Sequence, residues 1–266
     1  MDASSPVSPR RTPAEVVERL RAAGCVFAED EARLILAEAG TPAELERLLT
    51  LRTSGLPLEQ VLGWVDFCGR RITVRPGVFV PRRRTGLLVR RAARLIRPGS
   101  VAVDMCCGTG AVGAVLLAGE PELTLYAVDI DPAATACARE NIASRGGTAL
   151  TGDLFTALPP ALLGRVDVIV ANAPYVPTDA IARMPPEARL HEARVALDGG
   201  PDGLEVQRRL VAAAPDWLAP GGHLLVETSA GQAPETLAIF TRHGLTGRIT
   251  HSRALDATAV IGIRSA

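Results

Sequence analysis

Short apolar runs alternate with segments of helical spacing over most of the chain, from Val101 onward. The runs are rich in Val, Ile and Leu and are bounded by Gly, Pro, Asn or Asp, which is typical of buried strands. Strands are predicted near residues 101–104, 123–128, 147–151, 166–171, 222–227, 246–251 and 257–263. This alternation predicts an α/β fold with a doubly wound, Rossmann-like sheet. A short turn at Ala254–Asp256 predicts a C-terminal antiparallel hairpin.

The N-terminal part of the chain follows a different pattern. Thr12 and Thr41 each precede a proline and are followed three residues later by glutamate, which predicts two capping boxes at helix starts. Helices are expected near residues 13–23, 30–39, 42–54 and 58–63, and short strands near 71–74 and 78–80. We therefore expect a disordered tail over residues 1–10, a small helical domain over 11–69, linker strands within 70–83 and the α/β domain over 84–266.

One predicted strand runs directly into a turn with the residues Asn172, Ala173, Pro174 and Tyr175. The nitrogen of a carboxamide or an exocyclic amine is a poor nucleophile, because its lone pair is delocalised. If the Asn172 side-chain oxygen and the Ala173 carbonyl each accept one N–H, the nitrogen is held with its free lobe toward an electrophile. Pro174 restricts the backbone of Ala173, and the Tyr175 ring can lie on a planar substrate. These four are the candidate catalytic residues, although an ordinary Asn/Pro turn also explains the pattern.

A second motif lies upstream, where the predicted strand Val101–Asp104 leads into the tight turn Met105–Gly110. Gly108 and Gly110 allow a ligand to approach the backbone closely. The next strand ends in Asp129, nineteen residues beyond Gly110, an offset at which an acidic residue binds ribose hydroxyls. The turn has neither a third glycine nor a P-loop lysine. The pattern therefore favours a nucleoside without phosphates, and S-adenosylmethionine fits that description.

With both motifs in place, the chain resembles the protein-(glutamine-N5) methyltransferases that modify peptide-chain release factors. These are a branch of the class I S-adenosylmethionine-dependent methyltransferases. The resemblance runs from about Ala32 to the C-terminus. Its landmarks are residues 55–63, Phe79–Arg82, Asp104–Gly110, Val128–Asp129, Gly152–Leu154, Asn172–Tyr175 and Ala196–Leu204.

The resemblance implies a role for each of these positions. The methionine part of the cofactor would lie against Asp104, Cys106, Cys107, Gly108, Thr109 and Gly110. Asp129 and Ile130 would hold the ribose, and Asp153 with Leu154 the adenine. Asn172 would contact both the cofactor and the substrate amide, and Glu192 matches an acidic residue of the family. The helical domain would recognise the protein substrate.

Two positions depart from the family pattern. The family turn is usually Asn-Pro-Pro-Tyr, and this chain has Ala173 in place of the first proline, which removes a restriction on Asn172. Two family carboxylates near the site entrance are replaced by Arg84 and Gly86. The resemblance therefore supports methyl transfer more strongly than the release-factor substrate. The alternatives are a paralogue with another target, an adenine-N6 methyltransferase acting on RNA or DNA, and a cofactor-binding protein of reduced activity.

Composition is consistent with a cytoplasmic enzyme. The chain has 266 residues, of which 47% are hydrophobic, enough for a full core. No apolar run approaches membrane-spanning length, and residues 1–6 lack the basic-then-apolar order of a signal peptide. The five cysteines have no metal-site spacing, and we expect reduced thiols in apolar surroundings rather than disulfides. No metal is predicted.

Arginine is unevenly distributed along a chain whose formal net charge is zero. Ten arginines and no acidic residue lie between Phe67 and Val103. On a helix from about Arg84, several leucines could pack inward while most of these arginines face outward. The stretch could bind an acidic partner or a nucleic acid, but we favour a solvated helix face.

Overall fold

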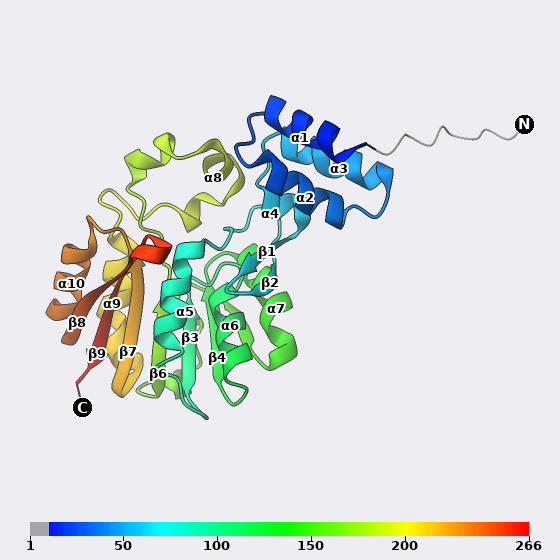
Figure 1. The fold of residues 1–266 in the computed structure, drawn as a ribbon. Coiled ribbons are helices and arrows are strands. Elements are labelled where there is room, and N and C mark those ends of the chain that lie inside the picture. Colours follow the sequence, from blue (N-terminus) through cyan, green and yellow to red (C-terminus); the bar gives the residue numbers. More distant parts are fainter. Residues whose placement is uncertain (1–10, 266) are drawn as a thin grey trace, which may run out of the picture.

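The computed structural model describes residues 11–265, so the disorder predicted for residues 1–10 lies outside the described part of the chain. A seven-stranded sheet in the order β5-β4-β3-β6-β7-β9-β8 forms the centre of the described fold (Figure 1). Its strands are β3 (Val101–Met105), β4 (Thr124–Asp129), β5 (Thr148–Thr151), β6 (Val166–Ala171), β7 (Leu218–Thr228), β8 (Leu245–Ser252) and β9 (Ala257–Arg264). All seven predicted strands are confirmed, and only β7 begins clearly earlier than expected.

The direction of the strands also follows the prediction. β3 pairs in parallel with β4 on one side and with β6 on the other, while β7 pairs in parallel with β6. β9 runs antiparallel to both β7 and β8, and the turn between β8 and β9 is the 3₁₀ helix η7 (Arg253–Leu255). The C-terminal antiparallel hairpin is therefore confirmed.

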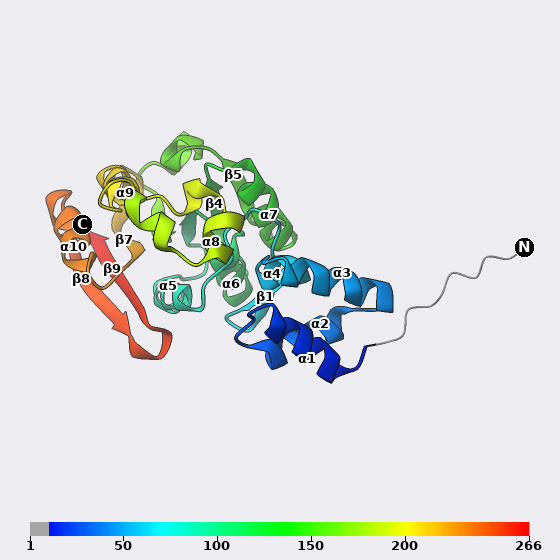
Figure 2. The ribbon, with the colours of Figure 1, turned by 90° about the horizontal axis from the view of Figure 1, so that it is seen from above.

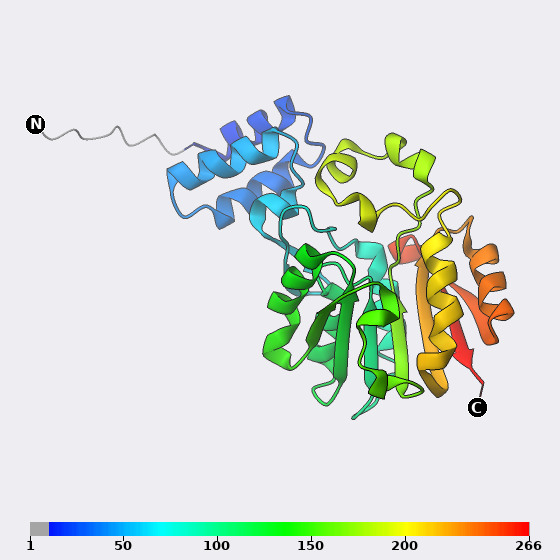
Figure 3. The same cartoon turned by 180° about the vertical axis from the view of Figure 1, so that it is seen from behind.

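Helices cover both faces of the sheet (Figures 1 and 3). Alternate strand residues face opposite sides, so Leu125 and Val168 join one buried cluster while Val103 and Ile169 join the other. The first cluster packs under α5 (Gly86–Ala92), α6 (Ala111–Gly119) and α7 (Pro132–Ile142). The second packs under α9 (Glu205–Trp217) and α10 (Ala233–Arg242). This is the doubly wound arrangement that the sequence predicts.

Four helices form a separate unit at the N-terminal end, namely α1 (Pro13–Ala22), α2 (Ala28–Glu38), α3 (Pro42–Thr53) and α4 (Leu58–Leu62). The capping box at Thr12 is confirmed, since its side chain and that of Glu15 bond each other's backbone N–H. At Thr41 only half of the box forms. Glu44 accepts instead from the backbone N–H of Gly40 at 3.0 Å, one residue before the cap.

The segment after α4 differs from the prediction. Trp64–Phe67 and Arg70–Thr73 form the antiparallel hairpin β1–β2, and its first strand was not predicted. Residues 78–80 form no strand, although neighbouring Gly77 pairs with Glu192 in an isolated bridge. A distant helix stabilises the hairpin, because Glu38 of α2 accepts from the Trp64 indole at 3.0 Å and pairs with Arg71. Within the hairpin, Arg71 stacks on the Trp64 ring. Local pattern could not reveal these partners.

The arginine-rich stretch lies mostly on the surface, as predicted. Leu87, Leu88 and Ile96 are buried in the sheet-facing cluster, while Arg90 and Arg94 are exposed. The helix is shorter than the stretch, because α5 ends at Ala92. In the described residues, no helix is both long and apolar enough to cross a membrane.

A long connection between β6 and α9 lies over the carboxyl ends of the central strands (Figure 2). We call residues 176–198 the roof segment. It contains η5 (Thr178–Arg183), α8 (Pro186–His191) and η6 (Arg194–Ala196), and a bridge between Val176 and Asp198 closes its base.

The roof segment is tied to the helical unit by partly buried polar contacts. Arg52 of α3 binds both carboxylate oxygens of Glu31, at 2.6 and 3.0 Å, and its Nη1 donates to Glu187 of α8 at 2.6 Å. Arg52 and Glu31 are both buried. Gln60 of α4 donates to the His191 carbonyl at 3.1 Å. The helical unit therefore helps to place the roof segment above the sheet.

Replacement of Arg52 should test this connection. We expect Arg52→Ala to lower the free energy of unfolding by about 3–5 kcal/mol, because it leaves the Glu31 carboxylate buried without a counter-charge. Arg21→Ala is the matched control, since the Arg21–Glu29 pair is exposed and should contribute about 1 kcal/mol or less. Urea denaturation followed by circular dichroism measures both. Equal effects of the two substitutions would mean that the buried pair stabilises the fold no more than an exposed one.

Candidate functional site

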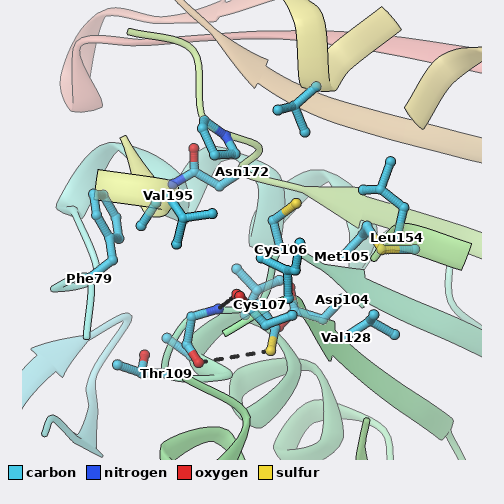
Figure 4. Close-up of a pocket in the computed structure, with 18 of the residues that line it drawn as sticks. Phe79, Asp104, Met105, Cys106, Cys107, Thr109, Val128, Leu154, Asn172 and Val195 are labelled. Carbon is cyan, nitrogen blue, oxygen red and sulfur yellow. Dashed lines mark hydrogen bonds between the residues drawn. The ribbon is translucent and has the colours of Figure 1, made fainter. Parts of the chain in front are cut away.

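Four polar residues at the carboxyl ends of parallel strands line one cavity (Figure 4). Asp104 lies in β3 and Asp129 ends β4, while Asp153 and Asn172 follow β5 and β6. In Figure 4, Asn172 and Val195 lie in the upper part of the view, and Cys107 and Thr109 of the loop lie below them. The parallel arrangement therefore brings the polar ends of four strands together at one cavity.

The loop from Met105 to Gly110 owes its shape to left-handed backbone positions. Cys106, Gly108 and Gly110 have φ values of 56°, 53° and 71°. A Cβ at Gly110 would lie 2.9 Å from the Ala138 Cβ, so glycine is needed there for space as well as for conformation. The backbone of the loop can then approach a ligand without side chains in between.

Asp104 supports this loop from within the protein. It is buried, and its Oδ2 accepts the backbone N–H of Gly113 in the first turn of α6 at 2.8 Å. Burial raises the pKa of Asp104 to about 7, and the hydrogen bond from Gly113 opposes this rise. The carboxylate therefore ties β3 to the helix that follows the loop.

Asp129 also organises the loop. Its Oδ2 accepts the Gly108 N–H at 2.9 Å, and its Oδ1 accepts the Asp131 N–H at 3.0 Å. Burial raises its pKa, and the two backbone hydrogen bonds lower it. The neighbouring Ile130 is half exposed and lines the cavity. Binding of ribose hydroxyls by Asp129 stays a prediction, but the carboxylate has the required place beside the loop.

Asp153 and Leu154 lie on the far side of Asp129 and line the same cavity. Leu154 has a φ of 50°, and Asp153 forms an ion pair with Arg209 of α9. The next residue, Phe155, is buried and stacks on Trp217 with ring centroids 5.5 Å apart. This stacking anchors the short turn that carries Asp153 and Leu154 at the cavity wall.

The cysteines of the loop behave as structural thiols, with Cys107 buried and Cys106 partly buried. Burial raises the pKa of both Cys106 and Cys107, so both stay protonated at neutral pH and are poor nucleophiles. Cys137 is also buried, as predicted. The prediction of apolar surroundings is wrong for Cys68, because this residue is exposed in the turn of the β1–β2 hairpin.

The residues present fit S-adenosylmethionine. The Thr109 hydroxyl lines the cavity, is buried and has no hydrogen-bond partner among residues 11–265, so it can bond a polar ligand group. Phe79, Val128 and Leu154 supply apolar walls. The one arginine on the lining, Arg209, is paired with Asp153. This lining suits a nucleoside better than a phosphate.

The turn after β6 is held by contacts from three other elements. Ala173 is fully buried, and Pro174 lines the cavity beside Asn172. The Asn172 Nδ2 donates to Thr85 Oγ1 at 3.4 Å. The Tyr175 carbonyl accepts from Gln232 at 3.0 Å, and its hydroxyl donates to Glu227 at 3.3 Å. Burial raises the pKa of Tyr175 to about 12.

Several polar residues near this turn were not predicted as site residues. Thr85, in the 3₁₀ helix η1 (Arg83–Thr85), contacts Asn172, and Glu227 of β7 contacts Tyr175 and Arg84. Glu227 could have been found by the signal that identified Asp104, namely an acidic residue at the carboxyl end of an apolar strand. Thr85 carries no such signal.

Glu192, whose role the resemblance left open, lies inside the base of the roof segment. It is buried, and Arg82 Nη2 donates to both of its oxygens, at 2.7 and 2.9 Å. The Val80 N–H donates to the same carboxylate at 3.0 Å. Glu192 therefore joins the roof segment to residues 80–82 and does not line the cavity.

Comparison with known proteins identifies similar sequences. A family model described as the methyltransferase small domain matches residues 70–203. A release factor glutamine methyltransferase of Geobacter sulfurreducens is 36% identical over 82% of this chain and 76% of its own. One of Mycolicibacterium smegmatis is 37% identical, covering 82% and 83%. A 4-amino-L-phenylalanine/4-methylamino-L-phenylalanine methyltransferase of Streptomyces pristinaespiralis is 32% identical, covering 88% and 80%.

Solved structures support the fold. A methyltransferase from Pyrococcus furiosus has a TM-score of 0.57 at 18% identity and covers 75% of this chain and 91% of its own. The 16S rRNA N2 G1207 methyltransferase of T. thermophilus, solved with AdoMet and guanosine, has a TM-score of 0.54 at 20% identity. It covers 76% of this chain and 49% of its own. At these identities the likeness concerns the fold alone.

Gly110 provides a test of the loop geometry. We expect Gly110→Ala to destabilise the protein by about 1–2 kcal/mol from the left-handed backbone alone, with a further cost from the crowded Cβ. Gly119→Ala is the matched control, because Gly119 ends the same helix and a Cβ there meets nothing within 4 Å. That change should be neutral or slightly stabilising. Thermal unfolding compares the two variants, and a stable Gly110→Ala protein would contradict the geometry.

Proposed function

Since the chain belongs to the family of release factor glutamine methyltransferases, S-adenosylmethionine-dependent enzymes, we propose that it methylates the side-chain amide of a glutamine in a peptide-chain release factor. The observation that carries this proposal is the place of Asn172. It lines the same cavity as the loop around Gly108, so an amide bound at Asn172 would face the proposed cofactor position.

The proposed reaction needs little acid–base chemistry. S-adenosylmethionine supplies an electrophilic methyl group on a positively charged sulfur. The N–C bond forms as the S–C bond breaks, and the amide nitrogen then releases one proton to solvent. Asn172 Oδ1 and the Ala173 carbonyl each accept one N–H of the amide and hold its nitrogen in line. Acceptors that are in place beforehand stabilise the charge that develops on the amide without reorganisation.

The same proposal includes the cofactor positions. Asp104 and Cys106–Gly110 would hold the methionine part, Asp129 and Ile130 the ribose, and Asp153 and Leu154 the adenine. The conformation of the loop, the free Thr109 hydroxyl and the apolar walls support these assignments.

We also propose that the helical domain, residues 11–69, recognises the protein substrate, and that the reaction takes place in the cytoplasm. The contacts of Arg52 with Glu187 and of Gln60 with the His191 carbonyl support the first point. They join the helical domain to the roof segment, so a protein bound on one could reach the cavity beside the other.

A second candidate acceptor is the aromatic amine of a free amino acid. One relative is named for that reaction, and Arg84 is a cation where the release-factor enzymes usually have a carboxylate. The Arg84 guanidinium lies 6.0 Å from the Tyr175 ring centroid, and its side chain is half exposed. An arginine at this place could bind the carboxylate of a small substrate.

The acceptor can be identified by incubating the protein with methyl-labelled S-adenosylmethionine and a release factor, RNA, DNA or 4-aminophenylalanine. We expect labelled N5-methylglutamine by mass spectrometry, and loss of the label when the acceptor glutamine is replaced by glutamate. Label on the arylamine alone would favour the second candidate. N6-methyladenine formed with a steep salt dependence, and no labelled glutamine, would overturn both.

Substitutions in the turn test the catalytic assignment. Asn172→Ala should lower kcat on the order of 100-fold or more, because it removes a preorganised acceptor. Ala173→Pro should keep or raise activity, since it keeps the carbonyl and restores the restriction on Asn172. Single-turnover rates measure both. A folded Ala173→Pro protein without activity would mean that the turn serves another acceptor.

A further substitution tests the cofactor assignment. Asp129→Ala should weaken S-adenosylmethionine binding by roughly 1.5–3 kcal/mol, the range for hydrogen bonds to a charged group. Asp131→Ala is the control, because Asp131 caps α7 through the Ala133 N–H and does not line the cavity. Calorimetric titration gives both affinities. Unchanged binding in a folded Asp129→Ala protein would rule out the ribose assignment.

A further inference from the structure

Glu227 is a buried carboxylate that the proposed reaction does not use. It lies near the end of β7, with 2% of the residue exposed. Its Oε1 accepts from Arg84 Nε and from the Tyr175 hydroxyl, each at 3.3 Å. A buried carboxylate is costly unless it is paired. The position of Glu227 next to the turn Asn172–Tyr175 therefore needs a physical reason.

Thr85 connects this carboxylate to Asn172. The Thr85 hydroxyl oxygen accepts from Asn172 Nδ2 at 3.4 Å, which leaves the hydroxyl proton free to be donated elsewhere. Burial raises the pKa of Glu227 and Thr85 lowers it, although no hydrogen bond joins the two side chains in the structure. Glu227 Oε2 is buried and has no hydrogen-bond partner among residues 11–265. The carboxylate is therefore an available acceptor for the Thr85 proton.

The direction of these hydrogen bonds determines which end of the Asn172 amide faces the cavity. An ionised carboxylate can only accept, so in a hydrogen bond between Thr85 and Glu227 the hydroxyl donates, and its oxygen is left to accept from Asn172. This arrangement keeps Nδ2 at Thr85 and leaves Oδ1 for the cavity that Asn172 lines. If the amide were turned over, Nδ2 would face the substrate nitrogen, and a donor would meet a donor.

We propose that Glu227 is a positioning residue, which acts through Thr85 to hold the Asn172 amide with its oxygen toward the methyl acceptor. The Tyr175 hydroxyl bonds the same carboxylate, so Glu227 also fixes the ring beside the acceptor position. The inference rests on the proposed function for its purpose, but the orientation of the amide can be measured without a substrate.

Arg84 supplies the counter-charge on the open side of this network. Its side chain is 47% exposed, whereas that of Glu227 is 3% exposed. Burial raises the pKa of Glu227, while Thr85, Arg84 and Tyr175 lower it. The charge of Arg82 opposes the rise that burial causes in the pKa of Tyr175. The Glu227 carboxyl therefore titrates above the ordinary glutamate range, and its protonation releases the constraint on Thr85.

The chain is well suited to a direct measurement, because it contains only two asparagines, Asn141 and Asn172. Selective ¹⁵N-asparagine labelling gives two side-chain NH₂ groups in a nuclear magnetic resonance spectrum. Asn141 is an internal control: its Nδ2 donates to the Thr73 and Thr109 carbonyls, and its Oδ1 accepts the Thr73 N–H. Asn172→Ala assigns the two signals.

In the wild-type protein, we expect the Asn172 Nδ2 signals to shift with pH as the Glu227 carboxyl titrates. The midpoint should lie above the ordinary glutamate pKa, while the Asn141 signals stay in place. Glu227→Gln and Thr85→Val should abolish this titration, and Thr85→Ser should retain it. Valine matches threonine in shape, so a folded Thr85→Val protein isolates the hydroxyl. A titration that persists in Glu227→Gln, or an Asn172 signal unchanged in Thr85→Val, would overturn the proposal.

Kinetic measurements test the same proposal through function. They use the acceptor that the wild-type protein methylates. Thr85→Val should lower kcat about 10-fold or more, because a misplaced acceptor disturbs alignment, with the KM for S-adenosylmethionine unchanged. Thr85→Ser should restore kcat. Wild-type kcat should fall at low pH, and Glu227→Gln should flatten that limb. A wild-type protein inactive on glutamine would refute the proposed function, and the resonance experiment would still decide the positioning role. If the wild-type protein is active and the Thr85→Val protein has the same kinetics, the positioning role is refuted and the proposed function stands.

Discussion

Ala102 of β3 pairs in parallel with Leu125 of β4 and with Val168 of β6. Parallel strands end at the same edge of the sheet, so the polar residues at their ends converge although they are far apart in sequence. Asp104, Asp129 and Asn172 share a cavity for this reason. The same pairing requires crossovers, and their helices bury the two faces of the sheet. Both the core and the site thus depend on one backbone constraint.

Buried carboxylates then place the segments around the cavity. Each is paired with an arginine from a distant part of the chain: Glu31 with Arg52, Glu192 with Arg82, and Glu227 with Arg84. A buried charge without its partner is strongly unfavourable, so each pair favours one arrangement of its two segments. The Glu192–Arg82 pair joins the roof segment to residues 80–82, and Arg52 of the helical domain also bonds Glu187 of the roof segment. The roof of the cavity is therefore held from two sides.

Two residues that depart from the family pattern, Ala173 and Arg84, lie at the turn Asn172–Tyr175 after β6. Ala173 leaves the Asn172 backbone less restricted than a proline would, while Arg84 neutralises a carboxylate buried behind the turn. In our proposal the hydrogen bonds of Thr85 and Glu227 restrain the Asn172 side chain. Arg84 also changes the charge at the site entrance, which bears on the choice between a protein glutamine and a small carboxylate-bearing amine.

The sequence alone determined the seven strands, the glycine loop and the polar strand ends, because strand periodicity and strand-end chemistry are encoded in neighbouring residues. It did not determine the β1–β2 hairpin, whose Trp64 depends on Glu38, or the half-formed capping box at Thr41. It also missed the contact of Thr85 with Asn172 and the place of Glu227. The capping difference at Thr41 is a local choice between two nearby backbone donors. The other features are contacts between residues distant in sequence, and at the turn after β6 only the packing of β6, β7 and η1 decides which side chains meet.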